Sequence, residues 1–82
     1  MKTNLRIYDN NGKTFDRYTV LFMDQPENRP GCYAALGMSD RPFHPQGFGQ
    51  HTVAMPGRHL GRRIELQDLP EDCRRLVAQN LA

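Results

Sequence analysis

The chain has 82 residues, of which 38% are hydrophobic and 24% are charged, and this is enough for one domain with one small core. It contains no apolar run long enough to cross a membrane, its first residues do not follow a signal-peptide pattern, and two cysteines are too few for a disulfide framework. We therefore expect a cytoplasmic protein with reduced thiols and no membrane contact. A core this small stabilises a chain only marginally, which leaves a homodimer open.

Positive charge is concentrated in one part of the sequence, although the net charge is only +2. Residues 41–63 contain four arginines and no acidic residue, whereas residues 64–82 contain two arginines and four acidic residues. A local excess of positive charge favours an acidic partner, either nucleic acid or the acidic face of a protein. The alternative is a solvated surface segment that binds nothing.

Two strands joined by a tight turn are expected at the N-terminus. Residues 4–9 alternate between polar and apolar side chains, which is typical of a half-buried strand. Asn11 and Gly12 follow, and both residue types tolerate the positive φ of a tight hairpin turn. Residues 13–23 are predicted to form the second strand, with a bulge where the Asp16-Arg17 pair interrupts the alternation.

A third strand and a long loop come next. Residues 24–31 contain two prolines, which cannot donate to a sheet ladder, and they predict a turn. Residues 32–38 are rich in small apolar side chains and predict an interior strand, with a short helical turn as the alternative because Ala and Leu favour it. Residues 39–61 are rich in proline and glycine and predict a long loop, with a short strand inside it at residues 51–54. Residues 62–66 alternate again and predict a final strand.

The chain ends in a predicted amphipathic helix. Asp68 is expected to be its N-cap, because Glu71 follows three residues later in a capping-box pattern and Pro70 falls in the first turn. Cys73 is expected to be a small core residue rather than a reactive thiol, because it belongs to an apolar stripe at helical spacing. The members of this stripe are Leu69, Cys73, Leu76, Val77 and Leu81.

Together these elements predict a single α+β domain over residues 1–82. It consists of a small antiparallel sheet of three or four strands that begins with the N-terminal hairpin, packed by one C-terminal helix. The long Pro/Gly-rich loop is expected to carry the function, because loops of this length are uncommon in compact domains unless they are functional or disordered.

No pattern in the sequence matches a catalytic or metal site. His44, His51 and His59 are spaced seven and eight residues apart, and without a Cys-x-x-Cys or His-x-x-x-His pair there is no zinc signature. Cys32 or Ser39, together with a histidine and Asp40 or Asp24, has the composition of a catalytic triad, but there is no nucleophile elbow and no phosphate-binding loop. We therefore expect a non-enzymatic protein without metal or cofactor, although three loop histidines can still converge on a metal.

The candidate site is formed by the basic, aromatic and histidine residues of the loop region. Arginines contact phosphates while aromatic rings stack on bases, and the same residue types on a stiff loop form hot spots of protein interfaces. Alternatively, Phe43 and Phe48 anchor the loop on the sheet. The leading hypothesis is binding to a host protein or nucleoprotein complex; the alternatives are a small nucleic-acid-binding protein and a structural dimerisation module. The predicted partner-binding residues are Arg41, Phe43, His44, Phe48, His51, Arg58, His59, Arg62 and Arg63.

Several short segments spread over most of the chain form a recognisable set. They are Ile7-Tyr8-Asp9-Asn10, Asp16-Arg17-Tyr18-Thr19-Val20, Gly37-Met38-Ser39, Pro42-Phe43-His44-Pro45-Gln46-Gly47-Phe48, His59-Leu60-Gly61 and Leu69-Pro70-Glu71-Asp72. In these segments the chain resembles a family of short proteins of phages and bacterial mobile elements, and the segment from Pro42 to Phe48 is the most specific. The resemblance brings no catalytic residues. It implies a compact inhibitor that binds a host defence component, as anti-CRISPR proteins do.

Overall fold

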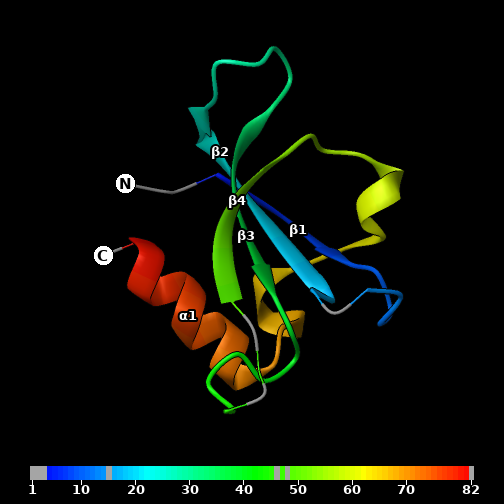
Figure 1. The fold of residues 1–82 in the computed structure, drawn as a ribbon, viewed down its shortest axis with the longest axis vertical. Helices are drawn as coiled ribbons and strands as arrows, with labels where there is room; N and C mark the ends of the chain where they lie inside the picture. The colour runs from blue at the N-terminus through cyan, green and yellow to red at the C-terminus, as the bar shows by residue number, and fades with distance from the viewer. Residues whose placement is uncertain (1–3, 15, 46, 48, 82) are drawn as a thin grey trace.

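The computed structural model describes residues 4–14, 16–45, 47 and 49–81. These residues form a five-stranded antiparallel sheet with one α-helix on one face (Figure 1). The strand order is β4-β3-β2-β1-β5. The α+β prediction is confirmed, but the sheet has five strands rather than three or four. The elements are β1 (Leu5–Asp9), β2 (Tyr18–Pro26), β3 (Tyr33–Met38), β4 (Gly49–Ala54), the 3-10 helix η1 (Arg58–Leu60), β5 (Arg62–Ile64), the 3-10 helix η2 (Leu66–Asp68) and α1 (Glu71–Leu81).

The predicted N-terminal hairpin is present, with a longer turn than expected. β1 pairs with β2 along its whole length, and Asn11 and Gly12 have positive φ values of 61° and 82°, as the turn prediction requires. β2 begins only at Tyr18, because the polar residues before it bond within the turn. The Asp16 carboxylate, for example, accepts a hydrogen bond from the Thr14 hydroxyl at 2.7 Å. The bulge predicted at this point is therefore wrong.

The β2–β3 hairpin extends beyond the rest of the sheet as a two-stranded arm, which lies at the top of Figure 1. Residues 24–31 are exposed, and the Glu27 N–H donates a hydrogen bond to the Cys32 carbonyl at 2.9 Å across the arm. The β2–β3 register shifts between Leu21 and Pro26, where the arm leaves the sheet. The turn is thus in its predicted place, although residues 24–26 of the predicted turn belong to β2.

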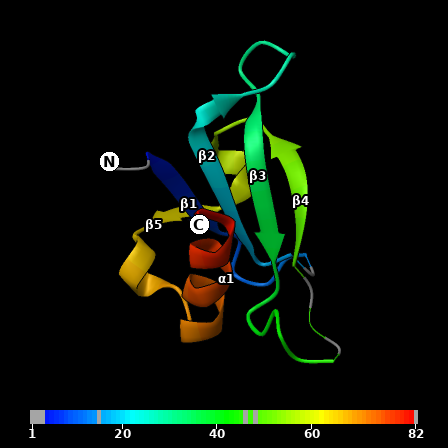
Figure 2. The same cartoon turned by 90° about the vertical axis from the view of Figure 1, so that its left-hand side faces the viewer.

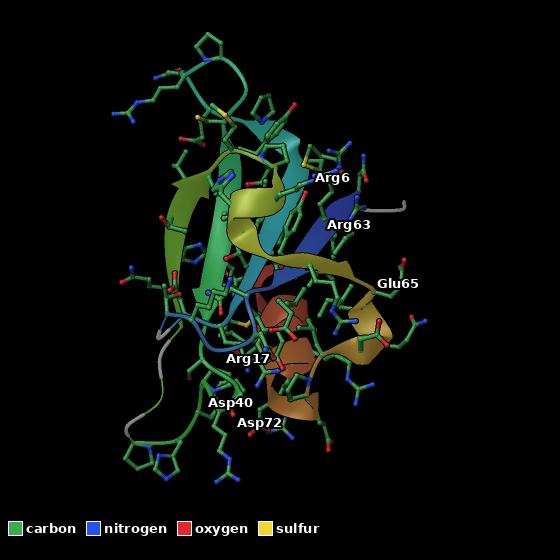
Figure 3. All side chains as sticks on the ribbon, turned by 90° about the vertical axis from the view of Figure 1, so that its right-hand side faces the viewer. Arg6, Arg17, Asp40, Arg63, Glu65 and Asp72 are labelled. Carbon is green, nitrogen blue, oxygen red and sulfur yellow. The ribbon has the colours of Figure 1, made fainter. Side chains whose placement is uncertain are left out.

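The predicted loop at residues 39–61 is divided by β4, which pairs with β3 along all six of its residues. The short strand predicted at residues 51–54 is therefore confirmed, and it begins two residues earlier. β4 forms one edge of the sheet and β5 the other, so residues 55–61 must cross the whole sheet between them. We call this segment the crossover; it contains η1, which lies in front of the sheet in Figure 3.

α1 packs on one face of the sheet and closes the main core (Figure 2). Cys73 and Val77 of α1 are almost completely buried in one cluster with Val20 of β2 and Leu36 of β3. The Cys73 thiol donates a hydrogen bond to the Ser39 carbonyl at 3.3 Å. The predicted role of Cys73 as a core residue is confirmed.

The start of α1 differs from the prediction. Asp68 lies in η2, where its carboxylate accepts a hydrogen bond from the Glu65 N–H at 3.0 Å and completes a capping box for that short helix. Leu69 is extended, with φ −74° and ψ 147°, and it separates η2 from α1. Leu69 is buried in the main core, so the chain leaves the helical path there and the prediction that Asp68 caps α1 is wrong.

A second, smaller core lies on the face opposite α1. Tyr8, Leu21 and Ala35 are buried there, and Leu60 of η1 packs against them. Leu60 thereby attaches the crossover to the sheet, while the two residues before it stay exposed.

Candidate functional site

An open pocket of about 600 Å³ lies where the β1–β2 turn meets the crossover and the start of β5. Its walls come from two segments that are far apart in the sequence. Three lining residues are arginine or lysine, one is histidine and one is acidic, so the pocket is predominantly basic. The lining residues are Asp9, Asn10, Asn11, Lys13, Arg58, His59, Gly61 and Arg62. We call this site the basic pocket.

The β1–β2 turn forms one wall of the basic pocket and is held by its own hydrogen bonds. The Asn10 side-chain oxygen accepts hydrogen bonds from the backbone N–H groups of Gly12 at 2.9 Å and Lys13 at 3.1 Å. The Asn10 side-chain nitrogen donates to the Thr14 hydroxyl at 2.6 Å. An asparagine that bonds to the backbone two and three residues ahead fixes the shape of a turn. The backbone of Lys13 is therefore held in place at the pocket.

The crossover forms the other wall, and its position requires Gly61. The φ of 111° and ψ of −155° at Gly61 are accessible essentially to glycine alone. A Cβ added at this position would also come within 2.6 Å of the Asn10 Cα. Gly61 thus allows the crossover to lie directly against the end of β1, which brings Arg58 and His59 to the β1–β2 turn.

Asp9 is the acidic residue of the basic pocket, and its charge is already paired. Its buried carboxylate accepts hydrogen bonds from Arg17 Nε at 2.9 Å and from the Asn11 N–H at 2.8 Å, and the Arg62 guanidinium lies 3.9 Å away. The hydrogen bond from Arg17 is the main reason that the pKa of Asp9 is lowered, against the opposing effect of burial. Asp9 therefore stays ionised and is already engaged with Arg17 and Arg62.

Two cations of the basic pocket have no such partner. Among the residues that the structure describes, no carboxylate lies within ion-pair distance of Lys13 or Arg58. Both side chains belong to exposed residues. Unpaired cations beside a rigid turn produce a local positive potential, and guanidinium and ammonium groups bind carboxylate or phosphate oxygens. The arrangement is thus suited to hold an anionic group.

Three of the predicted binding residues line the basic pocket, namely Arg58, His59 and Arg62. Arg63 follows on β5, where its guanidinium carbon lies 6.0 Å from the centre of the Tyr8 ring. This distance is at the limit for a cation–π contact, and the exposed Arg63 thereby covers one side of a buried aromatic ring.

Three other predicted residues lie in the turn between β3 and β4, at the lower end of the molecule in Figure 1. Arg41, Phe43 and His44 are all exposed. The Arg75 guanidinium carbon of α1 lies 5.8 Å from the centre of the Phe43 ring, so this ring contacts the helix and remains 44% exposed. Phe43 therefore lies at the end of the molecule where α1 begins, and it does not line the basic pocket.

The remaining two predicted residues are His51 and Phe48. His51 is exposed on β4, where it pairs with Leu36 and so lies on the same face of the sheet as α1. Phe48 lies outside the described residues. The predicted residues that the structure describes therefore lie in separate regions. After the β3–β4 turn the chain forms the edge strand β4, and the crossover then runs over the face opposite α1 to the basic pocket.

The sequence pattern does not single out Asn10, Asn11 or Lys13 as binding residues, because these positions predict only a hairpin turn. They join the candidate site through the pairing of β1 with β5, in which Asp9 lies opposite Arg62. The lysine directly after the turn is a local signal of positive charge. Nothing local indicates which distant segment packs beside it.

The described residues contain no group of three or more histidine, cysteine, aspartate or glutamate side chains that could hold a metal ion. His44 lies in the turn between β3 and β4, His51 lies on β4, and His59 lies in η1. Burial, with a smaller effect of Asp40, raises the pKa of the Cys73 thiol to about 12. Cys73 is therefore a neutral thiol near pH 7, and its reactivity as a nucleophile is low.

No family model matches the chain, and no match was found among curated proteins or solved structures. In the part of the chain that the structure describes, no helix is long and apolar enough to span a membrane. The function must therefore be inferred from the chemistry of the surface, of which the basic pocket is the most distinctive part.

Proposed function

We propose that the protein is a non-catalytic binding module that recognises an acidic group of a protein or nucleoprotein partner in the basic pocket. One observation carries this proposal: Asp9 is engaged by Arg17 and Arg62, whereas Lys13 and Arg58 have no acidic partner among the described residues. The charge that remains is positive, and an incoming carboxylate or phosphate would complete the pairing.

The rigidity of the pocket walls supports the same proposal. The Asn10 hydrogen bonds fix the turn that carries Lys13, and the packing of Leu60 fixes the crossover that carries Arg58. Binding to a preorganised site loses less conformational entropy than binding to a flexible loop. An anionic group can therefore be held without ordering a new segment of the chain.

The resemblance to short phage and mobile-element proteins suggests which partner to test first. It points to a host defence complex of the kind that anti-CRISPR proteins inhibit. A nucleoprotein complex offers both acidic side chains and phosphates, which are the two groups that suit the basic pocket. In this proposal the protein inhibits its target by occupying such a site.

The test is an affinity capture from host lysate with three forms of the protein. The pocket variant carries Lys13→Glu and Arg58→Glu, which leaves the Asp9 network intact. The control variant carries Arg29→Glu in the β2–β3 arm and Arg74→Glu in α1, two exposed positions with the same change in charge. We expect a defined protein to be retained by the wild type and the control, and its retention to fall at least about tenfold for the pocket variant. Equal retention by all three folded forms, verified by circular dichroism, would contradict the proposal.

Nucleic acid is the second candidate ligand, and an extension of the basic surface along the sheet favours it. Arg63 of β5 lies opposite Tyr8 of β1, so Arg63 and Arg6 lie on one face of the sheet, close together in Figure 3. This pair extends the positive charge beyond the basic pocket. Phe43 does not line the pocket, so binding would depend on phosphate contacts more than on base stacking.

A salt titration distinguishes nucleic acid from a protein partner. If phosphate contacts dominate, the affinity for a short oligonucleotide must fall steeply as salt concentration rises, and Arg63→Glu must weaken it further. Nuclease treatment of the lysate would then remove the captured material. Capture that survives nuclease, together with no measurable oligonucleotide binding at low salt, would rule this candidate out.

A further inference from the structure

The two edges of the sheet differ in how they are protected. β5 is three residues long and carries Arg62 and Arg63. Short length and charged side chains are features that keep an edge strand from pairing with another chain. β4 is six residues long, and its sequence, Gly49-Gln50-His51-Thr52-Val53-Ala54, contains no lysine, arginine, acidic residue or proline. β4 therefore has none of these protective features.

β4 is also largely uncovered, although Ala54 at its end packs against the second core. Five of its six residues are exposed, and Val53 is 47% exposed although it lies on the face that α1 packs against. α1 reaches β4 at Gly49, where an added Cβ would lie 2.6 Å from a methyl group of Leu76. Figure 2 shows the rest of β4 standing clear of the helix.

The chain also exposes more surface than its mass requires. Its accessible surface is 5666 Å² for 9.4 kDa, compared with about 5,000 Å² expected for a compact monomer of this mass. The uncovered strand β4 and the β2–β3 arm both contribute to this surplus. Pairing of β4 with another strand would cover part of it.

We propose that β4 pairs with β4 of a second copy of the chain, so that the dimer contains one continuous sheet with five strands from each copy. Residues opposite each other in an antiparallel pair lie on the same face, so the two-fold axis must pass between one residue of the strand and the same residue of the copy. With Thr52 opposite its own copy, His51 lies opposite Val53 and Gln50 lies opposite Ala54. Two threonines then meet at the axis, and Thr–Thr is a favourable cross-strand pair.

Charge favours a second copy over an acidic partner at this edge. β4 carries no lysine or arginine to attract an acidic strand, and it carries no like charges to repel its own copy. The cations proposed to attract an acidic partner, Lys13 and Arg58, lie in the basic pocket beside β1 and β5, away from β4. The exposed apolar side chains of Val53 and Met55 would be at or next to the new interface. The interface therefore matches its own copy better than it matches an acidic chain.

Sedimentation equilibrium of the purified protein tests the dimer. We expect twice the chain mass for the wild type and the mass of one chain for Thr52→Lys, because two lysines at the axis repel each other. Asn28→Lys, at the exposed tip of the β2–β3 arm, makes the same change in charge and should remain a dimer. Circular dichroism and thermal unfolding verify that each variant is folded. A monomeric wild type at millimolar concentration, or a dimer that persists in folded Thr52→Lys, would overturn the proposal.

Disulfide trapping tests the register in the folded dimer. In a Cys32→Ser background, Thr52→Cys places two thiols opposite each other at the axis, whereas Gln50→Cys places them about 13 Å apart along the strands. Mild oxidation should therefore link the chains of Thr52→Cys and leave those of Gln50→Cys unlinked. Linkage through Gln50→Cys but not through Thr52→Cys would overturn the proposed pairing.

Discussion

Asp9 connects three parts of the molecule. It ends β1, its carboxylate accepts a hydrogen bond from the Asn11 N–H of the β1–β2 turn, and it forms ion pairs with Arg17 and with Arg62 of β5. A buried carboxylate in this position is stable only because these groups replace the water it loses. The same carboxylate lines the basic pocket and lies 3.9 Å from the Arg62 guanidinium there, so one residue belongs to both the fold and the candidate site.

Replacement of this carboxylate should make the protein less stable in a pH-dependent way. We expect Asp9→Asn to lower the free energy of unfolding by about 1–3 kcal/mol at pH 7, because it weakens hydrogen bonds that involve charged groups. The pKa of Asp9 is lower in the folded chain than in the unfolded chain. Its contribution is therefore complete above the unfolded pKa, and it is lost as the pH falls through the folded value.

Denaturant unfolding of the wild type and Asp9→Asn between pH 7 and pH 2 checks this expectation. The difference in stability should be constant down to about pH 5 and should shrink below about pH 4. Glu27→Gln, an exposed carboxylate in the β2–β3 arm, is the matched control and should change stability by less than about 0.5 kcal/mol at every pH. A difference for Asp9→Asn that does not vary with pH would show that the lost stability has another origin.

Among the secondary-structure elements, those specified by neighbouring residues were predicted best. The alternation in β1 and the apolar stripe of α1 are local patterns, and both elements are present, β1 in its predicted place. The start of α1 was misplaced because burial of Leu69 in the tertiary core outweighs the local capping pattern around Asp68. The sequence could not indicate that β5 would pair with β1, because this contact joins distant segments and has no local signature.

The candidate site, like the fold, could be predicted only where a local pattern in the sequence marks its residues. The excess of arginine in residues 41–63 correctly draws attention to Arg58 and Arg62, which line the basic pocket. Lys13 was not anticipated, because it reaches the pocket only when β5 lies beside β1. Arg41 was grouped with them by sequence position, and β4 separates it from them in the structure. Proximity along the chain was therefore a poor guide to proximity in space.

Contact between the crossover and the end of β1 should depend on Gly61. We expect Gly61→Ala to destabilise the protein more than Gly12→Ala does, by at least about 1 kcal/mol. Both glycines have positive φ, which costs alanine about 1–2 kcal/mol, but an added Cβ finds open space at Gly12 and collides with the end of β1 at Gly61. Thermal unfolding of the two variants provides the comparison. An equal loss of stability would mean that the crossover does not lie against β1.

The two proposed binding surfaces, the basic pocket and the edge of β4, lie on opposite sides of the molecule. The basic pocket is built on β1 and β5 at one side of the sheet, and the open strand β4 forms the opposite edge. Pairing through β4 therefore leaves the pocket of each copy uncovered and places the two pockets toward the outer sides of the dimer. A dimer of this form presents two anion-binding sites, and a partner with repeated acidic groups can engage both at once.

Bivalent binding of this kind should be visible on a surface coated with a polyanion. On densely coupled heparin, we expect the wild type and Asn28→Lys to bind at least about tenfold more tightly than Thr52→Lys, because only the dimers engage two sites. The two lysine variants have the same net charge, so a difference between their affinities must come from dimerisation and not from net charge. On sparsely coupled heparin the affinities of the three forms should become similar. The Lys13→Glu/Arg58→Glu variant should bind weakly on both surfaces. Equal binding of Thr52→Lys and Asn28→Lys on the dense surface would show that the two pockets do not act together.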